Sequence, residues 1–279
     1  MLTGYTTAAI VKCANVFKDA IIFSTDNKYL SIVYKDLKFD FLLDNLSGLK
    51  SIVNDNKDFI YLGFKDGRID IYSIDIQKDS LKENKIDSFS SRQDTIDSLV
   101  YHPLFEAVFS SCSKNNSIHM RNRYGKYIFS LESPNPDILY VNKYNHELYS
   151  ANLDGSIKIF DSIRCDSKKI IHGSGNKIVS LEVFKDTIIV VLEKGIVNLY
   201  NSQTYNFFKR LSSYFNFSAS LIYKDSLLLG THGGIIKHFE LPTLRHFKDT
   251  IRHDKKINLL KNYDGKIFSA SEDLSVTIV

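Results

Sequence analysis

The chain has 279 residues, which is long enough to bury at least one sizeable hydrophobic core. Its composition, 43% hydrophobic and 24% charged, is that of an ordinary globular protein and excludes disordered and collagen-like classes. The formal net charge of +4 permits a polyanionic partner without requiring one.

The sequence carries no sign of membrane insertion or secretion. No apolar run approaches the roughly 18 residues of a membrane-spanning helix, and the start lacks a basic segment followed by a long apolar one. The three cysteines, Cys13, Cys112 and Cys165, are odd in number and far apart, as is usual for reduced thiols. We therefore expect a protein of the cytoplasm or the nucleus.

One pattern recurs along the chain: a strand, a tight polar turn and a second strand. The turns contain Asp-Gly, Lys-Gly, Gly-Gly or Asn-rich pairs, which tolerate the positive φ of two-residue hairpins. The seven copies occupy residues 20–36, 59–73, 107–122, 147–162, 188–202, 226–240 and 266–279.

All but one of the copies follow the previous one after about forty residues. The residues six places after each turn are Tyr34, Tyr72, Arg121, Phe160, Tyr200, Phe239 and Val279. Their spacings are 38, 49, 39, 40, 39 and 40 residues, and five of the seven are aromatic. A further apolar-alternating run precedes each hairpin and another follows most of them. Four short strands in about forty residues, repeated seven times, are typical of an all-β propeller.

The repeat predicts a single domain over residues 1–279 with seven blades of four antiparallel strands. The expected blades are about 8–47, 48–91, 95–134, 137–174, 176–214, 217–255, and 256–279 together with 1–6. The last repeat ends with its third strand, so we expect the N-terminal segment to supply the fourth. The 49-residue spacing places an insertion at residues 74–94, whose charge predicts a long surface loop.

Residue patterns that carry chemistry are scarce. No Cys or His spacing fits a zinc site, and Cys112 on a strand is better explained as a small core residue. The glycines around His232 and in the stretch from His172 to Lys177 fit turns better than an oxyanion loop or a phosphate loop, because the matching nucleophile and Gly-Lys-Ser/Thr ending are absent. We expect no catalytic residues, no metal and no cofactor.

These repeats resemble the WD-repeat family over essentially the whole chain. In that family the third strand ends in Trp-Asp, an Asp lies in the preceding turn, and a His precedes the first strand. Here aromatic residues replace Trp at five of these positions, namely Tyr34, Tyr72, Phe160, Tyr200 and Phe239. Asp161 follows Phe160, as Asp follows Trp in the family. The turn Asp is kept as Asp66, Asp154 and Asp273, and His253 occupies a histidine position. No blade keeps the full Asp-His-Ser-Trp set.

The resemblance implies that the hairpin turns lie on one face and that this face binds partners. Four basic residues of those turns are the candidate contacts with RNA or another partner: Lys28, Lys65, Arg68 and Lys114. Lysines spaced along loops can neutralise phosphates, with binding that weakens as salt rises. The alternative is that they are ordinary solvent-exposed charges.

Within the family, the chain is similar to the receptor for activated C kinase, a compact scaffold on the small ribosomal subunit. The short link at residues 121–131 and the pattern of the closing blade are similar to those of that receptor. Of the basic triplet that the receptor carries in the hairpin turn of its first blade, only Lys28 has a counterpart here. The similarity implies a non-catalytic scaffold that binds ribosomal RNA and small-subunit proteins and docks signalling or translation factors. The alternative is an adaptor that binds proteins only, in ribosome assembly, messenger RNA export, a checkpoint or G-protein-beta-like signalling.

Overall fold

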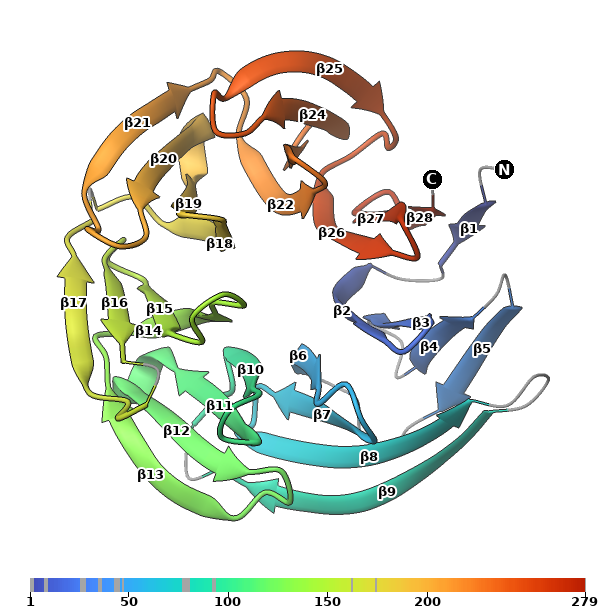
Figure 1. The fold of residues 1–279 in the computed structure, drawn as a ribbon. Coiled ribbons are helices and arrows are strands. Elements are labelled where there is room, and N and C mark those ends of the chain that lie inside the picture. Colours follow the sequence, from blue (N-terminus) through green and yellow to red (C-terminus); the bar gives the residue numbers. More distant parts are fainter. Residues whose placement is uncertain are drawn as a thin grey trace. The chain divides into compact units, whose positions relative to one another are not determined.

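A computed structural model describes residues 3–7, 10–25, 29–34, 37–42, 46, 48–76, 81–91, 94–161, 163–173 and 175–278. The strands are labelled in chain order in Figure 1. The chain divides into two compact units. Unit 1 comprises Met1–Leu43 and Asn176–Val279, and unit 2 comprises Asp44–Gly175. Within the described residues the strands form seven four-stranded antiparallel sheets, as the repeat predicts.

Unit 2 contains three of these sheets, and each is a simple meander along the chain. The first has the strands β6 (Leu49–Asn54), β7 (Phe59–Phe64), β8 (Arg68–Ile76) and β9 (Leu81–Ser90). The second has β10 (Ser98–His102), β11 (Ala107–Cys112), β12 (Ser117–Asn122) and β13 (Tyr127–Glu132), with a 3₁₀ turn η1 (Ser113–Asn115). The third has β14 (Pro136–Val141), β15 (Leu148–Asn152), β16 (Ile157–Phe160) and β17 (Ser167–Ile171).

Unit 1 contains the other four sheets. One comprises β2 (Val11–Phe17), β3 (Ala20–Thr25), β4 (Tyr29–Tyr34) and β5 (Leu37–Leu42). A second comprises β18 (Ile178–Phe184), β19 (Thr187–Leu192), β20 (Ile196–Asn201) and β21 (Phe207–Ser212), with a 3₁₀ turn η2 (Glu193–Gly195). A third comprises β22 (Phe217–Tyr223), β23 (Ser226–Thr231), β24 (Ile235–Glu240) and β25 (Arg245–Ile251). The fourth comprises β26 (Ile257–Tyr263), β27 (Lys266–Ser271), β28 (Ser275–Ile278) and β1 (Thr3–Thr6).

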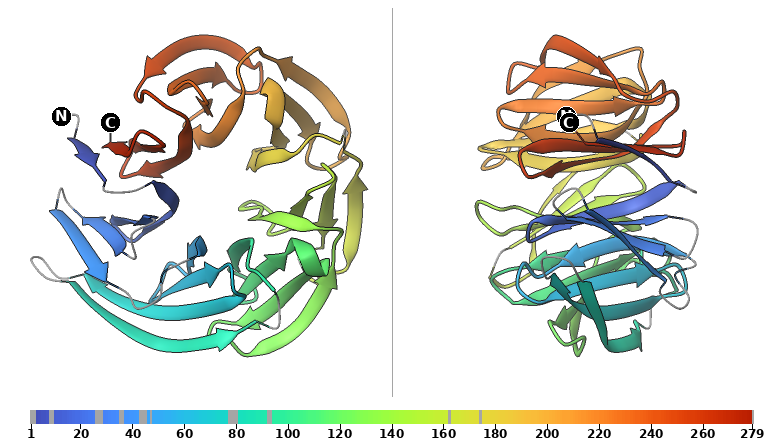
Figure 2. Two further views of the ribbon diagram at one scale, coloured as in Figure 1. Left: turned by 180° about the vertical axis from the view of Figure 1, so that it is seen from behind. Right: turned by 90° about the vertical axis from the view of Figure 1, so that its right-hand side faces the viewer.

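The fourth sheet of unit 1 joins the two ends of the chain (Figure 2). β1 pairs antiparallel with β28, from Thr3 opposite Ile278 to Thr6 opposite Ser275. The Thr7 backbone N–H and hydroxyl both donate to the carbonyl of Leu274, at 2.7 and 2.9 Å. The prediction that the N-terminal segment supplies the missing strand is confirmed.

The predicted surface loop at residues 74–94 is wrong for most of its length. Residues 74–76 continue β8, and residues 81–90 form β9, which pairs with β8 from Arg68 opposite Ser90 to Ile76 opposite Leu81. The segment continues a pattern that begins in β8: Ile69 and Ile71 flank Asp70, and Ile74 and Ile76 flank Asp75, with a break after Ile71 where the register with β9 shifts. Its high charge hid that alternation, because β9 is an exposed outer strand.

Apolar residues of one sheet pack against those of the next sheet in the same unit. The second strand of a sheet is the most buried: every residue of β11 and of β19 is buried. In unit 2, one core cluster joins Tyr61 and Ile71 to Leu99, and another joins Phe109 to Leu148 and Phe160. This burial explains why apolar residues occur on both sides of the inner strands.

The helical segments in the described residues are the two short turns η1 and η2. Accordingly, no helix in this part of the chain has the length and apolar character needed to cross a membrane.

Candidate interaction surface

The four basic residues singled out in the hairpin turns differ in their surroundings. Lys28 lies outside the described residues. Lys65 and Lys114 are exposed, in the β7–β8 turn and in η1 of unit 2, and neither makes an ion pair with another described residue. Their amino groups are therefore available to a partner.

Arg68, by contrast, is held by its own sheet. Its Nη1 donates to the carboxylate of Asp70 at 2.5 Å, and its guanidinium lies 3.8 Å from the centroid of the Phe64 ring. Asp70 is buried and also accepts from Lys85 at 3.1 Å and from the Ser88 hydroxyl. The charge of Arg68 offsets a buried carboxylate, so its first role is structural.

The turn aspartates stabilise the hairpins by accepting backbone N–H groups two residues later. Asp66 accepts from Arg68 at 3.1 Å, Asp154 from Ser156 at 2.9 Å, and Asp273 from Ser275 at 2.9 Å. This Asx-turn geometry accounts for an Asp at that position in three different sheets.

The residues at the family's Trp position occupy the third strands of their sheets. Phe160 is 2% exposed and Phe239 3%, and both belong to hydrophobic cores, while Tyr72 is also buried. Tyr34 and Tyr200 are half-buried. Asp161 accepts the backbone N–H groups of residues 163 and 164, and these bonds lower the pKa of its carboxyl group.

The last sheet of unit 1 keeps most of the family's polar network. The buried His253 ring contacts the Ser275 hydroxyl through Nδ1 at 2.7 Å and the Ser269 hydroxyl through Nε2 at 2.8 Å. Asp273 lies 3.3 Å from Nδ1 and accepts from Ser275. The Thr277 hydroxyl bonds to that of Ser269 at 2.6 Å. Burial lowers the pKa of His253, although Asp273 opposes the effect.

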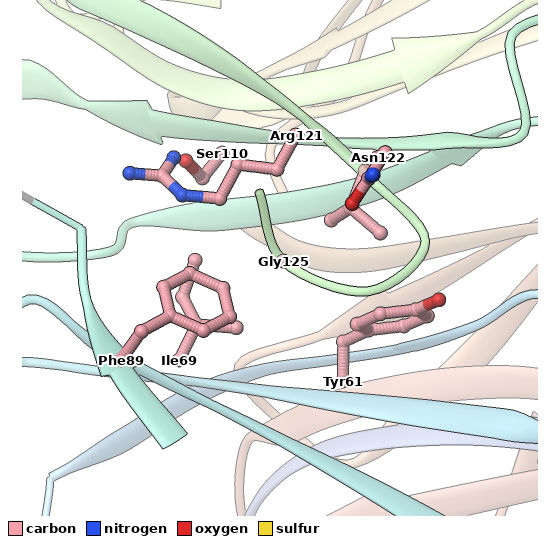
Figure 3. Close-up of a pocket in the computed structure, with 8 residues that line it drawn as sticks. Tyr61, Ile69, Phe89, Ser110, Arg121, Asn122 and Gly125 are labelled. Carbon is pink, nitrogen blue, oxygen red and sulfur yellow. The ribbon is translucent and has the colours of Figure 1, made fainter. Parts of the chain in front are cut away.

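In the second sheet of unit 2, Arg121 occupies the Trp position and lines a crevice (Figure 3). Its guanidinium lies 5.3 Å from the Phe89 ring centroid and 5.7 Å from that of Tyr127, and Nη2 donates to the Ser91 carbonyl at 2.7 Å. The crevice is too narrow to admit a water molecule. It is a packed contact between two sheets and not a ligand site.

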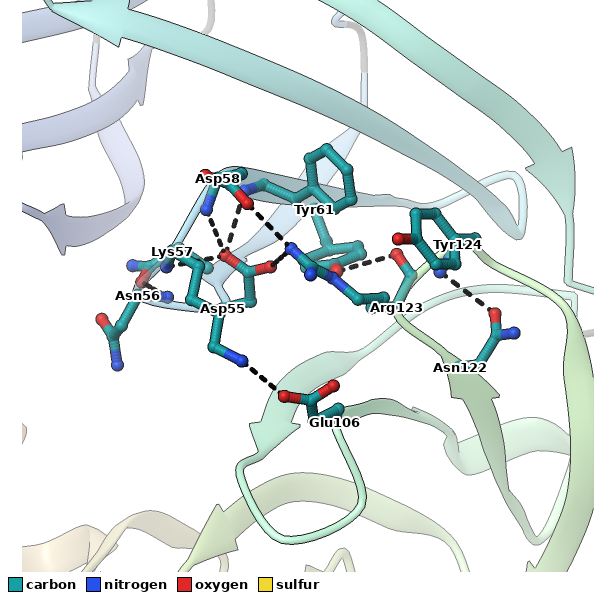
Figure 4. A network of polar contacts seen from close by, with 11 residues as sticks. Asp55, Asn56, Lys57, Asp58, Tyr61, Glu106, Asn122, Arg123 and Tyr124 are labelled. Carbon is teal, nitrogen blue, oxygen red and sulfur yellow. Dashed lines mark hydrogen bonds and ion pairs between the residues drawn. The ribbon is translucent and has the colours of Figure 1, made fainter.

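A polar cluster joins the first two sheets of unit 2 at the end opposite Lys65 (Figure 4). The fully buried Asp55 carboxylate accepts three backbone N–H groups, from residues 57 to 59, and one bond from Nη2 of Arg123 at 2.8 Å. The Arg123 guanidinium also contacts the more exposed Asp58 at 3.2 Å. The backbone carbonyl of Arg123 accepts a hydrogen bond from the Tyr61 hydroxyl at 2.9 Å. Burial, with the Asp55 charge beside it, raises the pKa of Tyr61. Sequence reasoning missed this cluster, because its members lie up to 68 residues apart.

The same end of unit 2 carries exposed apolar side chains, one on each of four turns. They are Leu104 (56% exposed), Tyr124 (60%), Tyr144 (50%) and Ile163 (76%). These four residues are here called the turn patch. The turns belong to the second and third sheets, which a contact of 2.7 Å between Nε2 of His102 and the carbonyl of His146 links at this end. Sequence reasoning missed the turn patch as well, although apolar residues in polar turns were a usable sign.

The described residues contain no group of three His, Cys, Asp or Glu side chains placed to hold a metal ion. The thiols in this part of the chain are also poor nucleophiles. All three cysteines are buried and free, and burial raises the pKa of Cys13 to about 12 and that of Cys165 to about 11.

The fold class is a seven-bladed β-propeller with four antiparallel strands in each blade. Among solved structures, the chain is similar to the WD40 β-propeller domain of Doa1, with a TM-score of 0.80. The alignment covers 99% of this chain and 95% of that one at 14% sequence identity. No family model and no curated protein matches the sequence. The likeness therefore establishes the fold.

Proposed function

We propose that the chain is a non-catalytic scaffold of the cytoplasm or the nucleus that holds proteins together in a complex. The observation that carries this proposal is the turn patch at one end of unit 2. Tyrosine is enriched among the residues that dominate binding energy at protein interfaces, and here two exposed tyrosines lie with two exposed aliphatic residues on turns at the same end of two linked sheets.

The finer form of the proposal places the scaffold on the small ribosomal subunit, in the manner of the receptor for activated C kinase. Lys65 and Lys114 support it, since both are exposed on hairpin turns without an ion pair to other described residues. Lys28 belongs to the same proposed contact with ribosomal RNA. The alternative is an adaptor that binds proteins only, through the turn patch.

Sucrose-gradient sedimentation of a cell lysate at low and high salt separates these forms. Co-migration with small ribosomal subunits that is lost at high salt, and lost in a Lys65→Glu/Lys114→Glu variant, supports the ribosomal scaffold. Migration in a heavy complex that resists salt but is lost in a Leu104→Ser/Tyr144→Ser variant supports the protein-only adaptor. Migration in light fractions at both salt concentrations contradicts the ribosomal form.

A further inference from the structure

The outer strands of two neighbouring sheets in unit 1 carry the same unusual pair, a Phe followed by a Lys at a β-bulge. In β21, Lys209 pairs with Leu199 and Phe207 pairs with Tyr200, so Phe208 has no residue opposite it. In β25, Lys248 pairs with His238 and His246 pairs with Phe239, so Phe247 has none. Phe208 and Phe247 are 39 residues apart, which is one repeat.

The bulges turn both rings towards solvent, because a bulged residue leaves the ladder and is re-aimed. Phe208 is 50% exposed and Phe247 is 53% exposed. The lysines that follow, Lys209 and Lys248, are also exposed, and neither forms an ion pair within the described part of the chain. Each site therefore offers an aromatic ring beside a free cation.

The bulged outer strands of unit 2 lack this pair. The bulged residue of β9 is Ile86 (42% exposed), followed by Asp87, and that of β13 is Ile128 (48% exposed), followed by Phe129. In β17 the bulged residue is Lys168, so an exposed apolar residue at the bulge recurs in two of the three outer strands of unit 2. The aromatic ring with a free lysine after it distinguishes β21 and β25.

Neighbouring groups fix the two sites and add positive charge. Nε of Arg210 donates to Asn198 at 2.9 Å, and its guanidinium lies 5.8 Å from the centroid of Phe207, which is itself 51% exposed. The Phe247 ring packs edge-on against His238, with centroids 5.9 Å apart. These contacts position the Arg210 guanidinium and the Phe247 ring before a ligand arrives.

Little negative charge opposes these cations. On β21 and β25 together the one acidic residue is Asp249, and its carboxylate is already occupied. It accepts from Nζ of Lys237 at 3.0 Å and from Nε2 of His246 at 2.6 Å. Figures 1 and 2 show β21 and β25 following one another along the outer side of unit 1.

We infer that this surface, formed by Phe208, Lys209, Arg210, Phe247 and Lys248 and here called the β21–β25 surface, binds the unpaired nucleotides of single-stranded RNA. Aromatic rings on strands stack on exposed bases, and lysines beside them neutralise the phosphates. A membrane is a poorer fit, since both Phe rings are half-buried against their own sheets and insert little. The inference is independent of ribosome association, because it concerns other residues than Lys65 and Lys114.

The test is fluorescence anisotropy of a labelled, unstructured 12-nucleotide RNA with the full-length protein. A Phe208→Ser/Phe247→Ser variant keeps the net charge, so a loss of affinity reports stacking and not charge. We expect it to bind at least about tenfold more weakly, given what a stacked base contributes. A Lys209→Gln/Lys248→Gln variant should reduce the slope of log K against log salt by about 1.4, for two phosphate contacts on a single strand.

The matched control is Ile86→Ser/Ile128→Ser, which removes the equally exposed bulge residues of unit 2 and should leave the affinity unchanged. A 12-base-pair duplex should bind more weakly than the single strand, because its bases are already stacked. Equal binding of RNA by the Phe variant and the wild type, with matching melting curves, overturns the inference. So does Phe-dependent sedimentation with phosphatidylserine-containing vesicles in the absence of RNA binding.

Discussion

The buried Asp55 carboxylate allows a sharp test of what joins the first two sheets of unit 2. Asp55→Asn preserves the shape of the side chain and the oxygen that accepts the backbone N–H groups of residues 57 to 59. It replaces the other oxygen, which lies 2.8 Å from Nη2 of Arg123, by an NH₂ group. Two donors then face each other in a site where Asp55 is fully buried and Arg123 is 18% exposed.

The expected cost follows from these contacts. A hydrogen bond between charged groups contributes roughly 1.5–3 kcal/mol, and leaving one member of a buried pair without its partner raises the cost towards about 3 kcal/mol. We therefore expect Asp55→Asn to lower the free energy of unfolding by about 3 kcal/mol. Urea unfolding followed by tyrosine fluorescence, with hydrogen exchange of the β6–β7 and β12–β13 segments, measures the change and locates it in unit 2.

The same arginine provides the control. Asp58 contacts Nη2 of Arg123 at 3.2 Å, but its side chain is 66% exposed, so Asp58→Asn should cost less than about 1 kcal/mol. An additional Arg123→Met substitution should recover part of the loss in Asp55→Asn, because it removes the unmatched donor. Equal losses for Asp55→Asn and Asp58→Asn would refute the argument that burial decides the strength of this cluster.

Three further predictions concern backbone conformation, pH and thiol reactivity. Gly234→Ala should destabilise unit 1 by about 3 kcal/mol, because a Cβ there would lie 1.9 Å from the carbonyl oxygen of His253. Gly175→Ala, also at positive φ but in open space, should cost only about 1 kcal/mol, and thermal melting compares the two variants. The pKa of His253 is lowered in the folded protein, so unfolding takes up a proton when the pH is below the ordinary histidine pKa of about 6.5. Stability should therefore decrease as the pH is lowered below that value, and His253→Gln should flatten a plot of melting temperature against pH. Cys13 and Cys165 should resist iodoacetamide at pH 8 in the folded protein and react in urea, so rapid labelling of the native protein would contradict their burial.

Regular features of the molecule were predictable from the sequence because they repeat. The forty-residue period and the alternation of apolar residues predict seven four-stranded sheets, and the unpaired last repeat predicts the strand formed by Thr3–Thr6. The same reasoning failed at residues 81–90, because the alternation of an exposed outer strand is too weak to identify it among charged residues.

The candidate sites were less predictable, because they depend on pairings between distant residues. Arg68 and Lys65 are both basic residues of the same hairpin turn, so the sequence does not distinguish them. In the structure Arg68 is bound to the buried Asp70, whereas Lys65 is exposed. The bulges that expose Phe208 and Phe247 arise from a register shift between two strands, which a local sequence pattern does not encode.

The pairing of β1 with β28 also constrains the order in which the chain folds during synthesis. Unit 2 is one continuous segment, Asp44–Gly175, so all its strands leave the ribosome before most of unit 1 exists. Unit 1 is built from both ends of the chain, and β1 waits unpaired until residues 275–278 are made. At the usual elongation rate of about 5–20 residues per second, that delay is on the order of ten seconds or more. During this interval β1 is an unpaired strand that a chaperone can bind and that can pair wrongly with a neighbouring chain.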